Sequence, residues 1–347
     1  MRVSVVIPVY NEEKNITATL NSIVRTGYTD MEILVVDDGS TDRTPAIVKK
    51  YADKRVRLLG IKRKGRSGAL NYGISKATGD YVLITDADSQ VNQDWIEQGV
   101  KSLEQEGVGA VTGPHFLRET KSMGQKMHLL LVLLLHDFLP ELLAKFNFCP
   151  KITGANVGFE KSIFGKVGFS EETTTDTLDI SFKIVKTGKR LVFNPRMLIT
   201  VEEPERFGSY FTKYKRWFGE IGRHLLIHMD VFRKASAADA LKYVPVWLFF
   251  LGMPALGLAL TVLAVYEFVA FGTLFWLNVI ALLVALLFTT VLAFSTASIA
   301  HYRKWRALAY LPLWLILLPT IAFFSAYSIF RYFTGRSYTG QYKPHRD

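Results

Sequence analysis

The stretch DYVLITDADSQV, residues 80–91, sets an apolar segment directly before two carboxylates. Residues 81–84 have the length and the apolar character of a buried strand. Asp86 and Asp88 follow one residue apart, and side chains at positions i and i+2 of an extended chain point the same way. Two such carboxylates repel each other unless a cation lies between them, which favours a bound divalent metal. The other interpretation is that Asp and Ser simply end a strand here.

The chain around this stretch repeats the same arrangement. Residues 2–11 (RVSVVIPVYN) and 31–42 (MEILVVDDGSTD) are apolar runs with polar ends, and helical spacing follows each of them. Strands that alternate with helices predict an α/β fold, with a mainly parallel sheet and helices on both faces. Ligands of such sheets bind at the carboxyl ends of the strands. The predicted ends lie at residues 8–11, 37–40 and 86–89.

Two of these three strand ends are acidic, so they need a cation if they converge. A nucleotide diphosphate with Mg²⁺ or Mn²⁺ fits, because a carboxylate ligates the ion and the ion bridges the phosphates. The segment IKRKGRSGALNYG, residues 61–73, lies between the acids in the sequence. Its basic side chains, on a glycine-rich loop, could cover a diphosphate. They are Lys62, Arg63, Lys64 and Arg66. No phosphate-loop motif GxxxxGK[ST] occurs.

The last third of the chain changes character. Three apolar runs, residues 243–266, 273–300 and 307–330, each exceed the roughly 20 residues that cross a hydrocarbon core. We therefore predict a front domain of residues 1–230 and a membrane domain of residues 231–347, with an interfacial helix and about three transmembrane segments. The other interpretation, a buried helical bundle in a soluble protein, is disfavoured because core helices usually keep a polar stripe.

Charge predicts the orientation in the membrane. The N-terminus has no signal peptide, so the front domain is expected to stay in the cytoplasm of a multi-pass protein of the cell membrane. Residues 301–306 (HYRKWR) are basic and belong inside, whereas a short link near Glu267 belongs outside. The tail, residues 331–347, is also basic, although three full crossings would leave it outside. Either the last, proline-interrupted segment does not cross, or the charge rule is broken.

The formal net charge of +11 suits a protein that faces anionic lipid and binds an anionic substrate. Nucleic acid is the rival explanation, and we find neither a basic helix nor an aromatic ribonucleoprotein motif to support it. Cys149 is the single cysteine, which permits no intrachain disulfide. These features direct attention to membrane lipids and a phosphorylated small molecule.

An unusually apolar segment, residues 127–146, interrupts the front domain. Its uninterrupted apolar part, residues 129–135, is too short to span, so we predict a helix that rests at the bilayer or against the membrane domain. His136 and Asp137 resemble a metal pair. We interpret them as polar residues on one side of that helix.

Four motifs occur in order along the front domain: VVIPVYNEE (5–13), VVDDGSTD (35–42), KGRSGALNYG (64–73) and TDADS (85–89). In this order they resemble the nucleotide-diphospho-sugar-binding GT-A fold of family 2 inverting glycosyltransferases, over roughly residues 1–230. The resemblance implies that the nucleotide base and ribose are bordered by Pro8, Tyr10, Glu12 and Asp38. It also implies that Asp86 and Asp88 form the DxD pair, with Asp88 as the ligand of Mg²⁺ or Mn²⁺.

Three later segments extend the resemblance. Residues 149–169 are similar to an acceptor-side segment in which a small-residue turn, here Thr153, Gly154 and Ala155, precedes a helix. Residues 170–190 resemble the segment with the TED motif of membrane-bound members. Thr175 replaces the Glu, and Asp176 remains. Residues 211–220 resemble the QxxRW motif, with Lys213 in place of Gln, and with Arg216 and Trp217 present.

The chemistry of transfer with inversion explains these residue types. An acceptor hydroxyl attacks the anomeric carbon opposite the leaving diphosphate, and a nearby carboxylate takes the proton. Asp176 is our candidate base. The charge of the leaving group would be shared between a metal on Asp88 and the guanidinium of Arg216. Trp217 offers a flat apolar face for a sugar ring or a wall beside the diphosphate. The KRW sequence also suits an amphipathic helix at the membrane surface, and both roles can hold together.

We therefore predict a membrane-embedded, metal-dependent inverting glycosyltransferase that uses a nucleotide-diphosphate sugar. The later motifs resemble those of polysaccharide synthases and ceramide glucosyltransferases, so the acceptor is a growing polysaccharide or a lipid. Three segments make a small pore, which keeps open a lipid acceptor or a channel built by a homo-oligomer. A noncatalytic membrane-bound sensor of nucleotide sugars is the rival, with Thr175 and Lys213 as marks of lost chemistry. A transporter is disfavoured because the membrane segments carry almost no charge.

Overall fold

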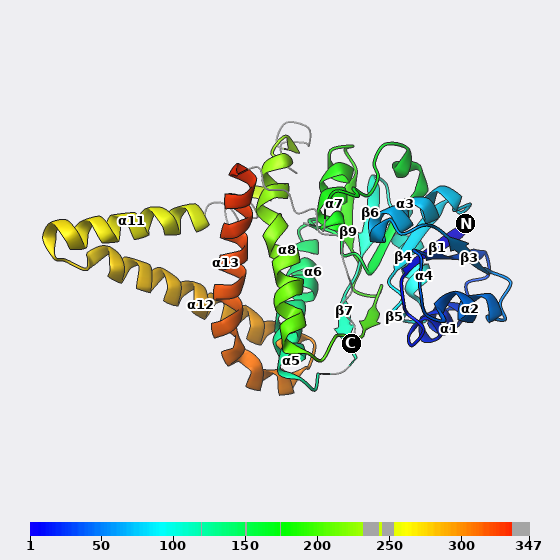
Figure 1. Ribbon diagram of the computed structural model, residues 1–347, viewed down its shortest axis with the longest axis horizontal. Coiled ribbons are helices and arrows are strands. Elements are labelled where there is room, and N and C mark those ends of the chain that lie inside the picture. The colour runs from blue at the N-terminus through cyan, green and yellow to red at the C-terminus, as the bar shows by residue number, and fades with distance from the viewer. Residues whose placement is uncertain (119, 150, 174, 232–242, 245–252, 335–347) are drawn as a thin grey trace.

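The computed structural model describes residues 1–118, 120–149, 151–173, 175–231, 243–244 and 253–334. The described strands and helices alternate through the first half of the chain, and apolar helices follow in the second half (Figure 1). The strands are β1 (Val3–Val9), β2 (Met31–Asp37), β3 (Val56–Gly60), β4 (Tyr81–Thr85), β5 (Ser89–Val91), β6 (Val108–Thr112), β7 (His115–Leu117), β8 (Asn156–Glu160), β9 (Arg190–Phe193) and β10 (Ile199–Val201).

The helices of the first 227 residues lie between and after these strands. They are α1 (Ile16–Val24), α2 (Thr44–Lys50), α3 (Gly65–Lys76), α4 (Trp95–Leu103), α5 (Met123–Leu131), the π-helical η1 (Val132–Phe138), α6 (Leu139–Ala144), the 3-10 helix η2 (Lys161–Gly165), α7 (Asp176–Val185) and α8 (Phe207–Ile227). The apolar helices after residue 252 are α11 (Met253–Phe271), α12 (Phe275–His301), the 3-10 helix η4 (Trp305–Leu313) and α13 (Trp314–Phe333).

The main sheet has seven strands in the order β3-β2-β1-β4-β8-β6-β9. All neighbours are parallel except β8, which runs antiparallel to both β4 and β6. Helices α3 and α7 pack on one face, for example through Leu70 and Ile180, and helices α1 and α4 cover the other face through Leu20 and Trp95. Strands buried on both faces are expected to read as continuous apolar runs, and β1, β2 and β4 do. The predicted mainly parallel α/β sheet is confirmed.

The predicted helix after the small-residue turn is wrong. The turn leads instead into strand β8, which begins at Asn156 and lies between β4 and β6, and only the short η2 follows it. Val157 and Phe159 are buried in the sheet. Because the pairing partners lie far away in the sequence, they override the local pattern.

The apolar insertion is helical, as predicted, but it is longer than the apolar core suggested. Helices α5, η1 and α6 follow one another without a break, and a capping box between Ser122 and Gln125 begins the run. The 22 residues from Met123 to Ala144 are long and apolar enough to cross a membrane, yet 56% of the most apolar window is buried in the protein. The run packs against α8, α12 and η4, so it lies against the C-terminal apolar helices, which is one of its two predicted positions.

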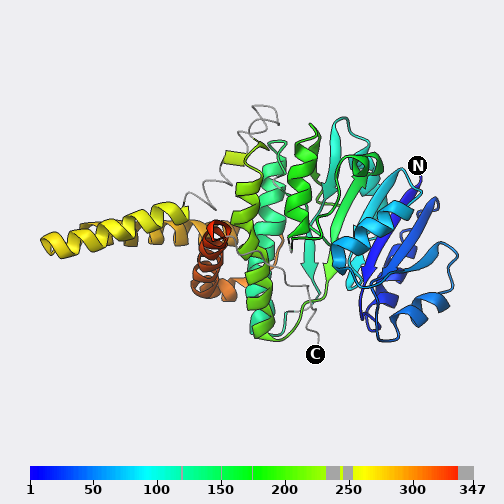
Figure 2. The ribbon, with the colours of Figure 1, turned by 45° about the horizontal axis from the view of Figure 1, so that its top comes forward.

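Helices α11 and α12 form a hairpin that projects from the rest of the molecule (Figures 1 and 2). Helix α12 and residues 305–327 are long and apolar enough to cross a membrane. The first predicted segment is only partly described, since residues 245–252 lie outside the described residues. The turn of the hairpin is at residues 272–274 rather than near Glu267, because the carboxylate of Glu267 accepts bonds from the backbone N–H of Trp276 and from Thr273 and so closes the turn.

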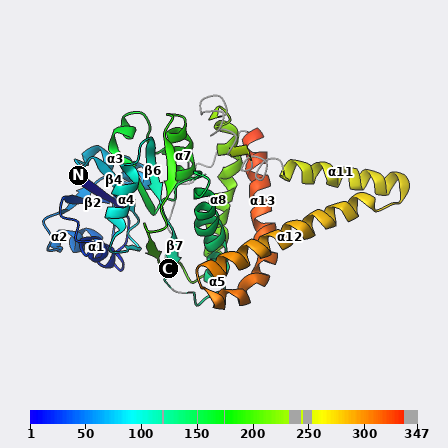
Figure 3. The ribbon, with the colours of Figure 1, turned by 180° about the vertical axis from the view of Figure 1, so that it is seen from behind.

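Helix α13 takes a different course from the hairpin. It runs beside α8, and Figure 3 shows the same neighbours from behind. Trp314, Leu317 and Ile321 are buried in a cluster that also contains Tyr214 and Phe218 of α8. The predicted third segment, residues 307–330, is therefore a 3-10 helix followed by a helix with one side on the front domain.

Candidate active site

A cavity of about 2840 Å³ opens where the strands of the main sheet have their carboxyl ends. All twelve predicted site residues line it. They are Pro8, Tyr10, Glu12, Asp38, Lys64, Asp86, Asp88, Gly154, Asp176, Lys213, Arg216 and Trp217. The strand ends therefore meet as the parallel sheet predicted, although the role of each residue stays a prediction.

The basic loop is held against the end of β2. Both carboxylate oxygens of Asp38 accept backbone bonds, from the N–H of Lys64 at 2.6 Å and from that of Gly65 at 2.9 Å. Gly65 has a φ of 82°, a conformation that favours glycine. The guanidinium of Arg63 lies 3.2 Å from the ring centroid of Tyr10, as a cation–π contact. The two motifs predicted to border the nucleotide thus form one wall of the cavity.

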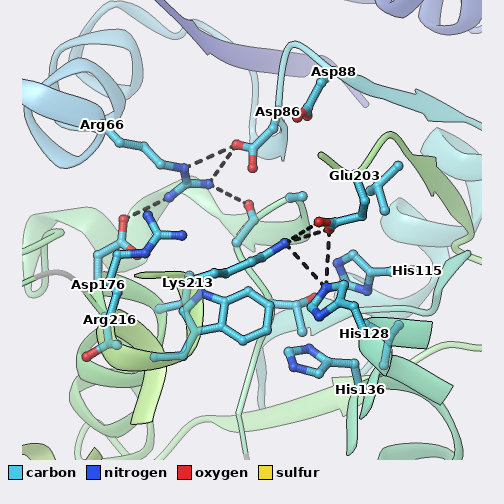
Figure 4. A pocket seen from close by; sticks show the side chains of 18 of the residues that line it. Arg66, Asp86, Asp88, His115, His128, His136, Asp176, Glu203, Lys213 and Arg216 are labelled. Atoms are coloured by element: carbon cyan, nitrogen blue, oxygen red, sulfur yellow. Dashed lines mark hydrogen bonds and ion pairs between the residues drawn. The ribbon is translucent and has the colours of Figure 1, made fainter. Parts of the chain in front are cut away.

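Arg66 joins the predicted metal site to the predicted base (Figure 4). Its Nε and Nη2 donate to Oδ1 of Asp86 at 3.1 and 3.0 Å, and its Nη1 donates to Oδ2 of Asp176 at 2.8 Å. Nη2 also donates to the carbonyl of Gly154 at 2.8 Å. Gly154 permits this approach, because a Cβ there would lie 3.0 Å from Nη2. One side chain therefore links three motifs.

The ion pairs keep Arg66 charged. Burial by itself lowers the pKa of this guanidinium, but the charges of Asp86 and Asp176 outweigh burial and raise the pKa above its usual value. The position of Arg66 in the basic loop is the one signal for it in the sequence. The pattern does not show which of the four basic side chains turns inward, and the contacts of Arg66 with Asp86 and Asp176 were not predicted.

Asp176 is the first residue of α7, and its carboxylate faces the cavity. Its Oδ2 also accepts from Ser67 Oγ at 3.3 Å, whereas within the described ranges its Oδ1 accepts no hydrogen bond. The N-cap of α7 is Thr175, so Asp176 does not cap its helix. Asp176 therefore keeps one carboxylate oxygen for a ligand.

The other acids of this segment are placed differently. Asp179 is buried on the far side of α7, where it pairs with Lys183 and with His228 Nε2 at 2.9 Å. Glu171 and Glu172 line the cavity but are exposed to solvent. Asp176 is thus the partly buried carboxylate of this segment that the cavity reaches.

The DxD pair suits a hard divalent cation. Asp86 and Asp88 are partly buried and line the cavity together. Oδ2 of Asp86 accepts no hydrogen bond in the part of the chain that the structure describes. Mg²⁺ and Mn²⁺ prefer carboxylate oxygens, and such sites commonly take one or two carboxylates with the remaining positions filled by substrate phosphates and water. The residues present therefore fit the predicted ion.

A second group has the spacing of a metal site, but its chemistry differs. Asp179, His224 and His228 bring their ligand atoms within 4.8 Å of one another. Two ammonium groups already lie there, since Lys183 pairs with Asp179, and Lys186 Nζ lies 2.8 Å from His228 Nδ1. None of the three residues lines the cavity. We interpret the group as a set of polar contacts that joins α7 to the C-terminal end of α8.

On α8 the ammonium of Lys213 is bound by an acid that the sequence analysis missed. Lys213 Nζ lies 2.6 and 2.7 Å from the two carboxylate oxygens of Glu203, and His128 Nε2 lies 3.3 Å from the same carboxylate. Burial raises the pKa of Glu203, but Lys213 and His128 outweigh burial and hold this pKa well below its usual range. Nothing in the segment VEEPER (201–206) distinguishes Glu203 from its acidic neighbours.

Lys213→Gln, which restores the Gln of the family motif, is expected to lower the free energy of unfolding by about 3 kcal/mol. The change leaves the Glu203 carboxylate buried without its cation. Because the folded-state pKa of Glu203 is depressed, the pair stabilises above about pH 4.3, the usual pKa of Glu, and this stabilisation is lost as the pH falls. Denaturant unfolding at pH 7 measures the loss, and the double variant Lys213→Gln/Glu203→Gln should recover most of it. Equal stability of wild type and Lys213→Gln would contradict the pairing.

In the π-helical η1, His136 and Asp137 point to different sides, although the sequence predicted that they share one side of a helix. His136 lines the cavity, and its ring centroid lies 5.2 Å from that of Trp217. Asp137 is fully buried away from the cavity, and its Oδ1 accepts from the backbone N–H of His115 at 2.9 Å. The prediction that both lie on one side of a helix is therefore wrong. Adjacent helical residues point about 100° apart, and π-helical turns are frequent at functional sites.

Comparison with known proteins agrees with this geometry. Residues 4–168 match the model of glycosyl transferase family 2. Poly-beta-1,6-N-acetyl-D-glucosamine synthase of Staphylococcus aureus (strain COL) is 27% identical over 227 residues, which are 64% of this chain and 55% of that protein. The enzyme of the same name from Staphylococcus epidermidis is 28% identical over 223 residues, or 62% and 53% of the two chains. This chain thus spans about half the length of these curated relatives.

A solved structure extends the likeness beyond the front domain. The mannosyltransferase PcManGT from Pyrobaculum calidifontis, in complex with GDP-Man and Mn²⁺, matches with a TM-score of 0.62 and 23% identity. The match covers 97% of this chain and 88% of that one. At this identity the likeness concerns the fold. The family match shows that residues 4–168 form a glycosyl transferase family 2 domain, and the solved structure agrees with a GT-A-like fold for this part of the chain.

Proposed function

We propose that this protein is a metal-dependent inverting glycosyltransferase that moves a sugar from a nucleotide diphosphate to an acceptor held at the membrane. The observation that carries the proposal is the Arg66 bridge, which joins Asp86 of the DxD pair to Asp176 inside the cavity. This contact holds a candidate donor site and a candidate base close together, and catalysis of a transfer between two substrates depends on such proximity.

The donor side of the cavity suits a nucleotide diphosphate sugar. Asp88 and Asp86 would hold Mg²⁺ or Mn²⁺, and the bound ion would supply positive charge to the diphosphate. Lys64 and Arg216 also line the cavity and would share the charge of the leaving group. The similar PcManGT structure contains GDP-Man and Mn²⁺, which supports this ligand class.

The acceptor side supplies the base. The acceptor hydroxyl oxygen forms a bond to the anomeric carbon as the bond from that carbon to the diphosphate oxygen breaks. The hydroxyl proton passes to Asp176, and the nucleoside diphosphate leaves with the bonding electrons. Attack from the face opposite the leaving group inverts the anomeric centre. Arg66 orients the carboxylate of Asp176 through Oδ2 and leaves Oδ1 for the proton.

The two departures from the family motifs leave this chemistry in place. Thr175 is buried at the N-cap of α7, and its backbone N–H donates to Thr173 Oγ1 at 3.1 Å. The ammonium of Lys213 is neutralised by Glu203. Neither replacement removes a group from the proposed reaction, which favours an enzyme over a noncatalytic sensor.

We further propose that the α11–α12 hairpin crosses the membrane and that α13 does not. Helix α13 has one side packed on α8 and its other side exposed, with Leu315 and Phe323 65% exposed. A helix of this kind lies in the membrane interface, whereas a two-helix hairpin returns the chain to the side it left. Residues 1–230 and the basic segments 301–306 and 331–347 then share the cytoplasmic side, which removes the conflict in the charge pattern.

Cysteine labelling tests this topology in intact cells. In a Cys149→Ala background, Leu274→Cys at the hairpin turn is expected to react with an impermeant maleimide. Arg306→Cys after α12 and Thr334→Cys after α13 are expected to be shielded until the cells are permeabilised. If Thr334→Cys reacts as fast as Leu274→Cys in intact cells, α13 crosses the membrane and the proposed topology is wrong.

The transfer itself is tested with purified protein in lipid nanodiscs. Radiolabelled nucleotide sugars are supplied one at a time with Mn²⁺, and products are separated into lipid-extractable and polymeric fractions. Label from at least one sugar is expected in one of these fractions. Metal-dependent donor binding without any product would favour the noncatalytic sensor.

A further inference from the structure

The cavity contains a lysine, Lys151, whose ammonium has no partner among the residues that the structure describes. Lys151 lies between α6 and β8, is partly buried, and lines the cavity. Over the described residues, no carboxylate or other acceptor contacts its ammonium. The comparably buried lysines differ, since Lys213 pairs with Glu203, and Lys186 pairs with Asp230. Lys151 thus differs from these two partly buried lysines, because no carboxylate of the described residues pairs with it.

An unpaired ammonium in such a place is costly. Burial lowers the pKa of Lys151 to about 8, so the side chain is still mainly protonated at pH 7. Proteins that shelter a charge usually pair it or use it to bind a ligand of opposite charge. The absence of a carboxylate partner among the described residues therefore points to an anion from outside the chain.

The groups beside Lys151 are hydrogen-bonding and neutral. The ring centroids of His115 and His136 lie 6.2 Å apart, and both residues line the cavity. Burial first, and then the charge of Lys151, lower the pKa of His115 to about 3, so this imidazole is neutral. Its Nδ1 is buried and has no hydrogen-bond partner in the described part of the chain. Lys151 and the two imidazoles can together bind an oxyanion.

Beyond these groups the cavity wall becomes apolar. It continues along Leu135, Leu139 and Leu143 of the helical insertion and reaches Leu287, Val291 and Phe294 of α12. Helix α12 belongs to the hairpin proposed to cross the membrane. A ligand that fills this part of the cavity therefore combines an anionic group with a hydrocarbon chain that leads into the bilayer.

We propose that the acceptor is a lipid with a phosphate in its headgroup, bound with the phosphate at Lys151, His115 and His136. The hydrocarbon chain follows the wall formed by Leu139, Leu143 and α12. This inference rests on the proposed glycosyltransferase function and narrows its acceptor. A neutral polysaccharide would leave the ammonium unpaired and would cover the apolar wall with hydroxyl groups.

Binding is measured on the full chain in phosphatidylcholine nanodiscs, with dodecyl phosphate as the probe. Dodecanol provides the same chain without the charge, and inorganic phosphate provides the charge without the chain. Dodecyl phosphate is expected to bind at least about tenfold more tightly than either, because a charge-assisted contact and apolar burial act together. If inorganic phosphate binds as tightly as dodecyl phosphate, the site is a phosphate site and not a lipid site.

Three variants locate the binding. Lys151→Met keeps the length of the side chain without its charge and is expected to weaken dodecyl phosphate binding about tenfold. Lys151→Arg should retain most of the affinity. Lys145→Met removes an exposed lysine near the same helix end and serves as the matched control, with unchanged affinity expected. Unchanged affinity in Lys151→Met would overturn the proposed phosphate site.

Thermal unfolding separates a binding role from a structural one. Without ligand, Lys151→Met should melt at the same temperature as wild type or higher, because it removes an unpaired sheltered charge. Dodecyl phosphate should raise the melting temperature of wild type more than that of Lys151→Met. A lower melting temperature with unchanged ligand response would show that Lys151 is structural. If the wild-type protein does not bind a nucleotide sugar in the presence of Mn²⁺, that result would instead contradict the transferase function.

Discussion

Asp176→Asn is expected to slow sugar transfer by about 10²–10⁴-fold, while the affinity for the nucleotide sugar changes little. The amide oxygen of Asn can still accept from Arg66, so the bridge to Asp86 is retained, but Asn cannot take the proton of the acceptor hydroxyl. The measurement combines initial rates of transfer with calorimetric titration of the donor. A melting temperature for each variant shows whether the protein is folded.

Glu172→Gln is the matched control for this experiment. Glu172 also lines the cavity, but it is exposed to solvent, and its replacement should leave transfer within about twofold of wild type. Near-normal transfer by Asp176→Asn would remove Asp176 as the base. Attention would then move to Glu171 and Glu172, since Asp179 is held by Lys183 and His228.

Asp88→Asn is expected to abolish turnover and to remove the metal dependence of donor binding. An amide is a weaker ligand than a carboxylate for Mg²⁺ or Mn²⁺, and it carries no charge to hold the ion beside a diphosphate. Donor titrations with and without Mn²⁺ measure the effect apart from turnover. For wild type, the affinity should fall when the ion is withheld, and for Asp88→Asn the two titrations should coincide.

Asp80→Asn controls for the loss of a carboxylate near the same strand. Asp80 precedes β4 at its other end, is exposed, and accepts from the backbone N–H of Arg2 at 3.3 Å. The Asp80→Asn variant should retain wild-type activity. Full activity of Asp88→Asn, or undiminished wild-type activity in excess chelator, would exclude the proposed role of the metal.

The strand ends were predictable because their signals are local. The acidic residue that follows each apolar run, Asp37 or Asp86, marks the end of the strand in the sequence itself. Parallel strands place such ends at one edge of the sheet. The position of Asp38 and Asp86 on the cavity wall therefore follows from the pattern alone. The same reasoning failed for β8, where the strand exists because β4 and β6 lie on either side of it.

The ionic contacts of the site were not predictable in this way. Arg66 reaches Asp86 across 20 positions of sequence and Asp176 across 110, and the two partners lie on different elements. The pairing of Lys213 with Glu203, and the lack of a partner for Lys151 within the described ranges, likewise depend on how α8 and the insertion pack. Hydropathy also failed to separate α13 from the hairpin, because it records how apolar a segment is and not what the segment lies against.

The Arg66 bridge also has a consequence for the order of events during turnover. A donor complex that draws Asp86 away from Arg66 leaves the guanidinium with Asp176 and Gly154 as its remaining partners. The occupancy of one substrate site then changes the free energy of binding at the other, and by thermodynamic linkage the effect is mutual. Arg66 would thus couple the two substrate sites. When the donor site is empty, its guanidinium would still be shared between Asp86 and Asp176, so the environment of the base would depend on donor binding before any acceptor binds.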